Sequence, residues 1–318
     1  MCLVALAIDE NRRFPLVLAA NRDEFFDRPA ARLGWWTPDE GGPAILAGRD
    51  LSAGGTWLGL SAAGRLALVT NVRRVATADP DAPSRGGIVP GWLRTDLRPD
   101  QFWMRTSLSG HAPFNLIAAD FRRGDCFWAS NEDAIPRRIE RGIWGLSNAG
   151  LDTPWPKVVA IKQRLADALD AADSVDGLSA QLFAALSDRT AAPDDALPAT
   201  GVGRERERLL SPAFIRTPDG SYGTRCSTVI VTEKVRRQLV THVFERTFTA
   251  GPGVALLRRV TLKDWPPRYS ERAAVSAAMP AVAETEVDAA AEDAAVAPPL
   301  PAKRTRVRSL LKPAHKIF

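Results

Sequence analysis

The second residue of the chain is a cysteine, and its position allows chemistry that an internal cysteine lacks. A small second residue permits removal of Met1, after which Cys2 would carry the free α-amine of the chain. That amine, with a pKa of about 7.7–8.0, can accept the proton of a thiol whose pKa is about 8.5. Cys2 is therefore a candidate nucleophile with its own base. The alternative is a small buried residue at a frayed terminus.

A polar cluster follows the second of two short apolar runs, and a hairpin would bring it back beside Cys2. The runs, residues 3–8 and 14–20, are separated by a polar segment, a pattern typical of two antiparallel strands. Symmetric pairing sets Cys2 opposite Ala20, with the register open by one or two residues. The polar cluster comprises Asn21, Arg22, Asp23 and Glu24. Its charges could hold a thiolate and an ammonium in place; the alternative is a solvated turn.

A second hairpin pattern brings glycine beside an asparagine. Residues 56–60 and 66–71 pair around a short turn segment, which sets Asn71 opposite Gly55. Glycine allows a ligand to approach the main chain closely. The Asn71 amide could donate to a developing oxyanion, an interaction that typically contributes about 2.7–4 kcal/mol to catalysis. The alternative for Asn71, and for Asn148 between two nearby glycines, is a turn-capping side chain.

Composition favours one large folded domain. The chain has 318 residues, 45% of them hydrophobic, which is enough to bury a sizeable core. No run approaches the ~20 apolar residues needed to cross a bilayer. The first apolar run ends at Asp9 and lacks a basic segment before it, so we expect no signal peptide and a cytoplasmic location. The net charge of +5 is too modest to predict a nucleic-acid partner.

The other cysteines and the histidines offer little alternative chemistry. Three cysteines are too sparse for a disulfide framework, and Cys126 and Cys226 lie in strand-like runs typical of buried thiols. Neither Cys-x-x-Cys nor His-x-x-x-His spacing occurs, so we expect no metal site. The histidines fall in a turn, a strand-like run and the tail: His111, His242 and His315. This set gives a Ser-His-Asp arrangement little support and favours a nucleophile with its own base.

The remaining patterns indicate strands, then helices, then strands. Three strand-like runs should form a meander: 114–121, 126–130 and 142–147. Two helical stripes follow: 154–170, with proline at its start, and 178–186. A Pro- and Asp-rich loop at 191–200 leads to a last hairpin, 228–232 with 239–248. This order predicts a sheet-rich, layered α+β fold.

The end of the chain differs in composition from the rest. Residues 273–302 are rich in Ala, Pro and Glu and contain no Lys or Arg, whereas residues 303–318 contain only basic charges. The pattern predicts a folded domain at 1–272, followed by a disordered acidic linker with a basic end at 273–318. That basic end could touch anionic surfaces.

Six groups of residues, in order between Met1 and about residue 270, together resemble a known family. They are Met1-Cys2; Ala20-Asn21-Arg22-Asp23-Glu24-Phe25; Gly54-Gly55-Thr56-Trp57-Leu58-Gly59; Thr70-Asn71; Leu146-Ser147-Asn148 with Asp152-Thr153-Pro154-Trp155; and Tyr222-Gly223-Thr224-Arg225. They resemble the NRDE family, also called the transport and Golgi organisation protein 2 family. That family is grouped with N-terminal-nucleophile hydrolases of the penicillin acylase and bile-salt hydrolase branch. The resemblance implies a four-layer αββα fold in which the mature cysteine attacks an amide.

The resemblance also implies roles for single residues. Arg22 with Asp23 resembles the family's arginine–acid pair, but the closer spacing here leaves open whether Asp23 or Glu24 is the acid. Trp57 is one of several tryptophans that could line an apolar pocket. The implied catalytic residues are Cys2, Arg22, Asp23, Asn71 and Asn148. The implied substrate-binding residues are Asn21, Glu24, Gly55, Trp57 and Arg225.

The function that these observations favour is hydrolysis or acyl transfer on an amide or thioester of a small-molecule or acyl substrate, without a cofactor. The alternative suggested by the resemblance is a carrier that handles haem or acyl-lipid and coenzyme A compounds in the same cleft. Its candidate haem ligands are Cys2, His111 and His242. A third hypothesis is a scaffold without chemistry whose basic tail is the working part.

Overall fold

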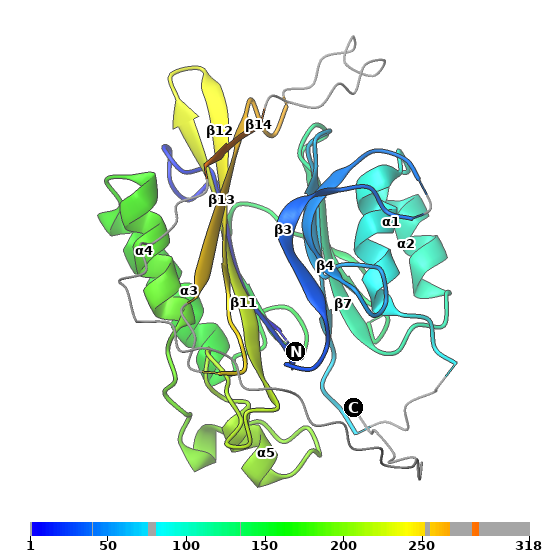
Figure 1. The fold of residues 1–318 in the computed structure, drawn as a ribbon, viewed down its shortest axis with the longest axis vertical. Helices are drawn as coiled ribbons and strands as arrows, with labels where there is room; N and C mark the ends of the chain where they lie inside the picture. Colours follow the sequence, from blue (N-terminus) through cyan, green and yellow to red (C-terminus); the bar gives the residue numbers. More distant parts are fainter. Residues whose placement is uncertain are drawn as a thin grey trace, which may run out of the picture.

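The computed structural model describes residues 2–39, 41–75, 81–133, 135–251 and 255–267, together with a short strand at Val282–Thr285. Two antiparallel sheets of seven strands each lie face to face (Figure 1). The first sheet has the order β10 (Gly142–Leu146), β1 (Cys2–Ile8), β2 (Leu16–Phe25), β11 (Tyr222–Val235), β12 (Gln238–Thr247), β13 (Leu256–Lys263) and β14 (Val282–Thr285). The second has the order β3 (Ala30–Trp36), β4 (Ile45–Asp50), β5 (Leu58–Ser61), β6 (Arg65–Asn71), β7 (Phe114–Asp120), β8 (Asp125–Ser130) and β9 (Arg137–Arg138).

Helices cover the outer face of each sheet, so the layers follow the order αββα (Figure 1). The first sheet is covered by α3 (Pro156–Ala171) and α4 (Val175–Leu186), and the second by α1 (Ile88–Arg94) and α2 (Pro99–Ser107). Three shorter helices lie outside these layers: η1 (Arg85–Gly87), η2 (Asp194–Ala196) and α5 (Arg204–Leu209). The expected α+β class and four-layer sandwich are confirmed.

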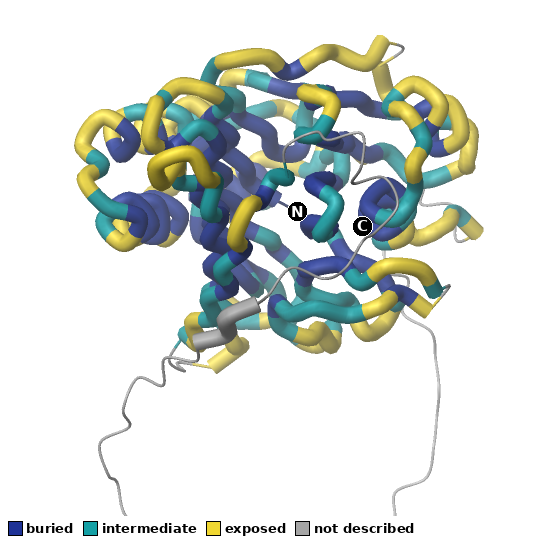
Figure 2. The backbone as a smooth tube through the Cα atoms, turned by 90° about the horizontal axis from the view of Figure 1, so that it is seen from above, coloured by how far each residue is buried: buried dark blue, intermediate teal, exposed yellow. Residues whose placement is uncertain are grey.

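Strands β1 and β2 of the first sheet are buried on both faces, which explains their unbroken apolar runs. Along β1, Val4 and Leu6 point into the core between the sheets, whereas Leu3 and Ala5 point into the core beneath α3 and α4. Viewed from above, buried residues lie in the interior of the molecule and exposed residues lie around its outside (Figure 2). Because side chains alternate along a strand, the face that each polar residue takes at the strand ends follows from these apolar positions.

Helix α3 shows how the sequence positions the outer layer. Pro156 occupies the first helical turn, where its missing N–H costs no hydrogen bond, and the helix runs through the predicted stripe. Val158, Ile161 and Leu165 of that stripe are buried against the first sheet. A Cβ on Gly145 of β10 would lie 2.6 Å from Val158 Cγ1, so this bare position allows the helix to pack closely. The predicted helices at 154–170 and 178–186 are confirmed with slightly different ends.

The first hairpin differs from its prediction by two residues. Cys2 lies opposite Arg22 rather than Ala20, because the loop is longer and better organised than its sequence suggested. The side chain of Asn11 accepts hydrogen bonds from the backbone N–H groups of Arg13 (2.9 Å) and Phe14 (3.1 Å), which fixes this loop. An even shift keeps every side chain on its expected face. The second hairpin has the predicted register, with Leu58 opposite Leu68 and Leu60 opposite Leu66.

The predicted meander at 114–147 is wrong in its last member. β7 and β8 pair in the second sheet, but β10 crosses over and pairs with β1 in the first. The outer edge of β8 is taken instead by β9. Apolar runs identify strands but not their partners, and the crossover brings Asn148, just after β10, back to the amino terminus. The hairpin predicted at 228–248 is confirmed as β11 and β12.

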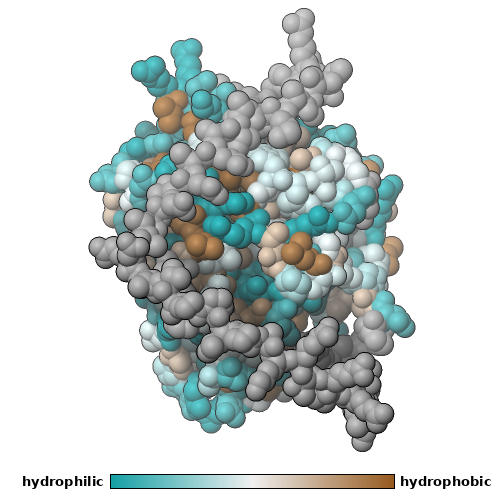
Figure 3. Space-filling view, in the orientation of Figure 1, coloured by the Kyte–Doolittle hydropathy of each residue, from teal (hydrophilic) through white to brown (hydrophobic). Residues whose placement is uncertain are grey.

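The predicted domain boundary at residue 272 and the basic end at 303–318 lie outside the described residues. From the expected linker the structure describes only β14, which pairs antiparallel with β13 at the edge of the first sheet. On the face shown in Figure 3, hydrophobic residues form small patches among hydrophilic ones. Within the described ranges, no helix has the length and apolar character needed to cross a membrane.

Candidate functional site

A half-open cavity of about 350 Å³, here called the Cys2 cavity, opens between the sheets where β1 begins. In Figure 1 the amino terminus lies between the two sheets at this end. Parts of both sheets and residues 82–86 form its wall. Its charged lining residues are Arg22, Asp23, Glu24, Arg28, Arg32, Arg49, Asp50, Arg85, Arg225 and Glu245. The same space between the sheets that elsewhere holds apolar side chains here holds charges.

Cys2 is the first residue of β1 and lies on the cavity wall. It continues the alternation of Val4 and Leu6, which places its side chain between the sheets. Only 6% of the residue is exposed, and this burial raises the pKa of the thiol to about 11 while Met1 is attached. The amino-terminal ammonium lowers that pKa and the charge of Asp23 raises it, so both groups act on the sulfur. A thiol in this position is protonated near neutral pH and needs a base to become a nucleophile.

Arg22 lies directly opposite Cys2 in the β1–β2 ladder. Its Nη2 atom is 3.5 Å from Oε2 of Glu24 and 3.5 Å from Oδ2 of Asp50, a residue of the second sheet. The same Asp50 oxygen accepts a 2.7 Å hydrogen bond from Arg28. The Arg22 guanidinium therefore sits next to the sulfur in a network of carboxylates that joins the two sheets.

Asp23 points to the other face of β2, towards the helices. Oδ1 accepts a 2.7 Å hydrogen bond from the Thr224 hydroxyl, and the Asp23 carbonyl accepts one of 3.1 Å from Tyr222. Burial raises the pKa of the Asp23 carboxyl, and the amino-terminal ammonium and Lys157 oppose that rise. Of the two candidate acids, Asp23 faces the amino terminus while Glu24 faces Arg22.

Lys157, in the first turn of α3, is a buried cation near the amino terminus. Its Nζ donates a 2.9 Å hydrogen bond to the carbonyl of Leu210, and burial lowers its pKa to about 8. The charge of Asp23 opposes this shift. The ion pair of Arg73 with Glu207, joined at 2.5 Å, is also buried and acts on Lys157. Buried charges of both signs therefore surround the start of the chain on its helical side.

The two predicted asparagines meet, but only one lines the cavity. Asn71 ends β6 and forms part of the wall. Asn148 is fully buried behind it and donates from Nδ2 to the Asn71 carbonyl at 2.8 Å. The neighbouring Ser147 hydroxyl donates to the Cys2 carbonyl at 2.9 Å. Asn148 and Ser147 therefore hold the main chains of the two wall residues, while the Asn71 side chain is the one that a ligand could contact.

Two predicted substrate-binding residues do not reach the cavity. Asn21 lies on the helical face of β2, where its Nδ2 donates to the carbonyls of Leu186 and Ala213, both at 2.8 Å. The alternation of Val17 and Ala19 towards that face carries this information in the sequence. A Cβ on Gly55 would lie 2.1 Å from the carbonyl oxygen of Gly86, so this glycine is needed for a neighbouring main chain and not for a ligand.

Arg225 and Trp57 do line the cavity. Arg225 is the extra residue of a bulge in β11, and the bulge turns its side chain back to the end of β2. There its Nη1 donates to the carbonyls of Phe25 at 2.5 Å and Arg28 at 2.9 Å. Trp57 contributes an apolar wall, whereas Trp92 and Trp155 are packed in the two outer cores.

Six charged lining residues were not predicted, and four of them are arginines: Arg28, Arg32, Arg49, Arg85, Asp50 and Glu245. Their sequence contexts resemble those of ordinary surface charges. Only the meeting of the two sheets shows that they share a cavity. Neither His111 nor His242, the candidate haem ligands besides Cys2, is among the residues that line it.

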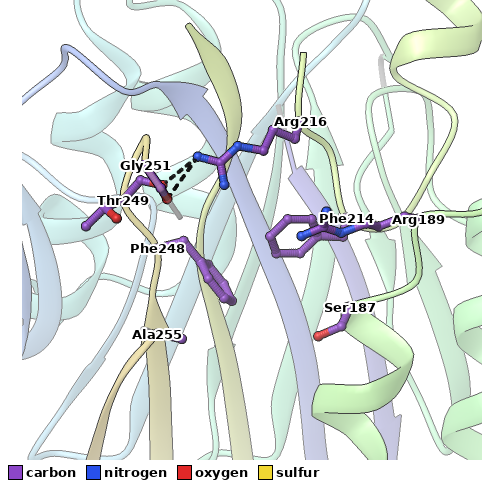
Figure 4. A pocket seen from close by; sticks show the side chains of 8 residues that line it. All are labelled: Ser187, Arg189, Phe214, Arg216, Phe248, Thr249, Gly251 and Ala255. Atoms are coloured by element: carbon purple, nitrogen blue, oxygen red, sulfur yellow. Dashed lines mark hydrogen bonds between the residues drawn. The ribbon is translucent and has the colours of Figure 1, made fainter. Parts of the chain in front are cut away.

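A second hollow of similar volume lies elsewhere, here called the Arg216 hollow (Figure 4). It is lined by Ser187, Arg189, Phe214, Arg216, Phe248, Thr249, Gly251 and Ala255. Arg216 donates to the carbonyls of Thr249 and Ala250, and the Arg189 guanidinium stacks 4.7 Å from the ring centre of Phe214. The Ser187 hydroxyl donates to the Phe183 carbonyl at 2.7 Å. Both arginines and the Ser187 hydroxyl are thus engaged by the protein itself.

An αββα sandwich whose first strand opens with a cysteine, at a charged cavity between the two sheets, is the arrangement of the N-terminal-nucleophile hydrolase class. The family model described as "Transport and Golgi organisation 2" matches residues 1–250, and the chain belongs to this family. The resemblance noted from the sequence motifs is therefore confirmed.

Curated relatives match most of the chain. The bovine Transport and Golgi organization protein 2 homolog is 37% identical over 253 residues, which cover 73% of this chain and 89% of the relative. The human homolog is 34% identical over 249 residues with the same coverage, and the Drosophila melanogaster protein is 27% identical over 274 residues, covering 78% and 93%. Among solved structures, the Caenorhabditis elegans N-acylethanolamine-hydrolyzing acid amidase ortholog has a TM-score of 0.41 at 12% identity and covers 72% of this chain and 92% of its own.

Proposed function

We propose that the protein is a cysteine N-terminal-nucleophile hydrolase or acyltransferase that acts on an amide or thioester of a small acyl substrate. The observation that carries the proposal is the position of Cys2. It is at once the residue that becomes the amino terminus when Met1 is removed and a wall residue of a charged cavity. Arg22, Asp23 and Asn71 line the same cavity.

Removal of Met1 places the missing base on the nucleophile itself. The free α-amine of Cys2 takes the thiol proton as Sγ attacks the substrate carbonyl carbon, which forms a C–S bond and a tetrahedral oxyanion. The ammonium then returns the proton to the leaving amine or thiol as the C–N or C–S bond breaks. Water, or another acceptor in acyl transfer, attacks the resulting thioester and releases Cys2.

The neighbouring residues have separate tasks in this proposal. Asp23, on the helical face of β2, holds the ammonium of the processed terminus. Arg22, opposite Cys2, favours the thiolate over the thiol by its charge. The Asn71 amide donates to the oxyanion. The Asn148 side chain keeps Asn71 in place by donating to the Asn71 main-chain carbonyl.

The direct test compares two thiols of the same cavity. Cys226 also lines the cavity, and burial raises its pKa, but it is internal and has no amine of its own. Intact mass should show that Met1 is absent, and iodoacetamide near pH 7.5 should label Cys2 much faster than Cys226. Equal labelling of both thiols, or a chain that retains Met1 and still turns over substrate, would contradict the proposal.

The carrier hypothesis differs in one outcome, because a carrier would bind an acyl or haem ligand and return it unchanged. The Cys2→Ala variant separates the two: an enzyme should keep acyl-ligand binding and lose its reaction, an acyl carrier should lose neither, and a haem carrier that uses Cys2 as a ligand should lose haem binding. A cytoplasmic site of action belongs to the proposal, since three sparse thiols suit a reducing compartment.

A further inference from the structure

The arginines of the Cys2 cavity fall into two groups. The arginines of the first group each contact a carboxylate. Arg22 contacts Glu24 and Asp50, Arg28 also contacts Asp50, and Arg49 contacts Asp39. The second group, Arg32, Arg85 and Arg225, lines the same cavity, and no carboxylate of the described residues lies within ion-pair distance of them. The cavity therefore has more positive charge than its own acids balance. Burial also raises the pKa of Glu245, the one of these acids that lies on β12.

Arg85 is the member of the second group whose charge interacts with Cys2. Burial lowers its pKa, and the two groups whose charges oppose that change are Cys2 and Glu24. Arg225, in contrast, is committed to two backbone carbonyls. Arg32, on β3, acts on the buried carboxyl of Glu245.

The segment that carries Arg85 is held firmly against the second sheet. Ser84 caps the short helix η1 by accepting from the Gly86 N–H, and the Gly86 carbonyl accepts a 3.0 Å hydrogen bond from Thr56 N–H. The close packing of Gly86 on Gly55 leaves no room for a side chain between them. Nη1 of Arg85 donates to the Pro113 carbonyl at 3.0 Å. The main chain that carries the guanidinium is thus held in place, and one of its N–H groups already has an acceptor.

We propose that Arg85 is the anion-binding residue of the Cys2 cavity, and that the substrate carries a carboxylate or phosphate close to the bond that Cys2 attacks. This inference rests on the function proposed above. The structure records one hydrogen bond for this guanidinium among the described residues, so its other N–H groups are available to a ligand. A planar guanidinium with adjacent donors matches the two oxygens of a carboxylate or phosphate. Trp57 and Val69 offer apolar surface for the acyl part in the same cavity.

The binding test uses the Cys2→Ala chain, so that ligands are not consumed. N-hexanoylglycine and N-hexanoylglycinamide differ only in the charge of one group, and their Kd values are measured by titration calorimetry. We expect the acid to bind about tenfold more tightly than the amide, as one charge-assisted hydrogen-bonded contact would give. N-hexanoylphosphoethanolamine tests a phosphate in place of the carboxylate. The anion with the lower Kd identifies whether the site prefers a carboxylate or a phosphate.

Arg85→Gln in the same background should remove the preference for the anion, while Arg85→Lys should keep part of it. The matched control is Arg189→Gln, which changes an arginine of the Arg216 hollow and should leave the preference intact. Equal affinity for acid and amide with Arg85 present would overturn the inference. A preference that survives in Arg85→Gln would also overturn it.

A covalent comparison separates this inference from the proposed function. In the processed chain, iodoacetate should label Cys2 faster relative to iodoacetamide than it labels a free thiol such as glutathione. Arg85→Gln should lower the iodoacetate rate selectively; an equal fall for both reagents would assign Arg85 to the thiolate and contradict anion binding. If Cys2 resists both reagents but the anion preference in binding remains, the hydrolase proposal fails and the role of Arg85 stands.

Discussion

The Cys2 cavity and the Arg216 hollow have similar volumes of about 350 Å³, and both are lined by arginines, yet their polar groups are used differently. In the Arg216 hollow, Arg216 donates to backbone carbonyls, Arg189 stacks on Phe214, and the Ser187 hydroxyl is bonded to its own helix. In the Cys2 cavity, three arginines for which the described part of the chain offers no carboxylate partner share the wall with a thiol at the start of the chain. The comparison shows that a candidate site is marked by polar groups that lack partners within the described residues, and not by the size of a hollow.

The largest expected difference between the two hollows is in turnover. Cys2→Ala should lower kcat/KM by a factor of about 10³ or more once a substrate is identified, because the nucleophile is lost. Ser187→Ala, the corresponding change in the Arg216 hollow, should leave kcat/KM within a factor of two or so. Substantial activity in Cys2→Ala would show that the reaction does not pass through this sulfur.

The Arg216 hollow should matter for stability instead. Phe214 is buried and packs edge-to-face on Phe248 with ring centres 5.0 Å apart. Phe214→Ala should therefore lower the free energy of unfolding by about 3–5 kcal/mol, measured by urea denaturation. The folded fraction should keep its kcat. Loss of activity without loss of stability would reverse the roles assigned to the two hollows.

Asn71 should affect turnover by an intermediate amount. Asn71→Ala removes the wall amide and should lower kcat by about 10²–10³, with a smaller change in KM. Thr249→Ala in the Arg216 hollow is the control, and steady-state kinetics on both variants provides the measurement. An unchanged kcat in Asn71→Ala would remove Asn71 from the oxyanion site.

The smallest effect is a dependence of stability on pH. In a chain that retains Met1, burial raises the pKa of Cys2 from 9.0 to about 11, so the unfolded thiol loses its proton first. Stability from this residue is complete below pH 9 and is lost as pH rises to about 11, roughly 2–3 kcal/mol in total. Urea titrations over this range should show a decline that Cys2→Ala reduces. An equal decline in both chains would mean that the thiol is not buried as described.

Apolar periodicity, which is local, predicted most of the strands and the layered α+β class, whereas the four-layer order was implied by the family resemblance. Periodicity placed the second hairpin in its correct register, where Gly64 takes the turn at φ 86°. The first register lies two residues from the symmetric pairing, within the range left open, because the Asn11 side chain organises a longer loop that apolar runs do not reveal. Helix α1 was missed since its seven residues include both Pro90 and Gly91, which usually indicate a turn.

The candidate site was predictable only where residues are close in sequence or in a motif. Cys2, Arg22 and Asp23 are brought together by one hairpin, so local reasoning found them. Arg85 depends on the packing of Gly86 on Gly55, which joins segments 31 residues apart in a way that no periodicity encodes. The placement of Asn21 towards the helices could have been read from the alternation of Val17 and Ala19.

The most direct test of a nucleophile with its own base is the pH profile of Cys2 alkylation in two chains. One is the processed chain, and the other has a bulky residue inserted between Met1 and Cys2 to block processing. The processed chain should be labelled rapidly near neutral pH, and the blocked chain only as the pH approaches 11. Identical profiles in the two chains would contradict the account.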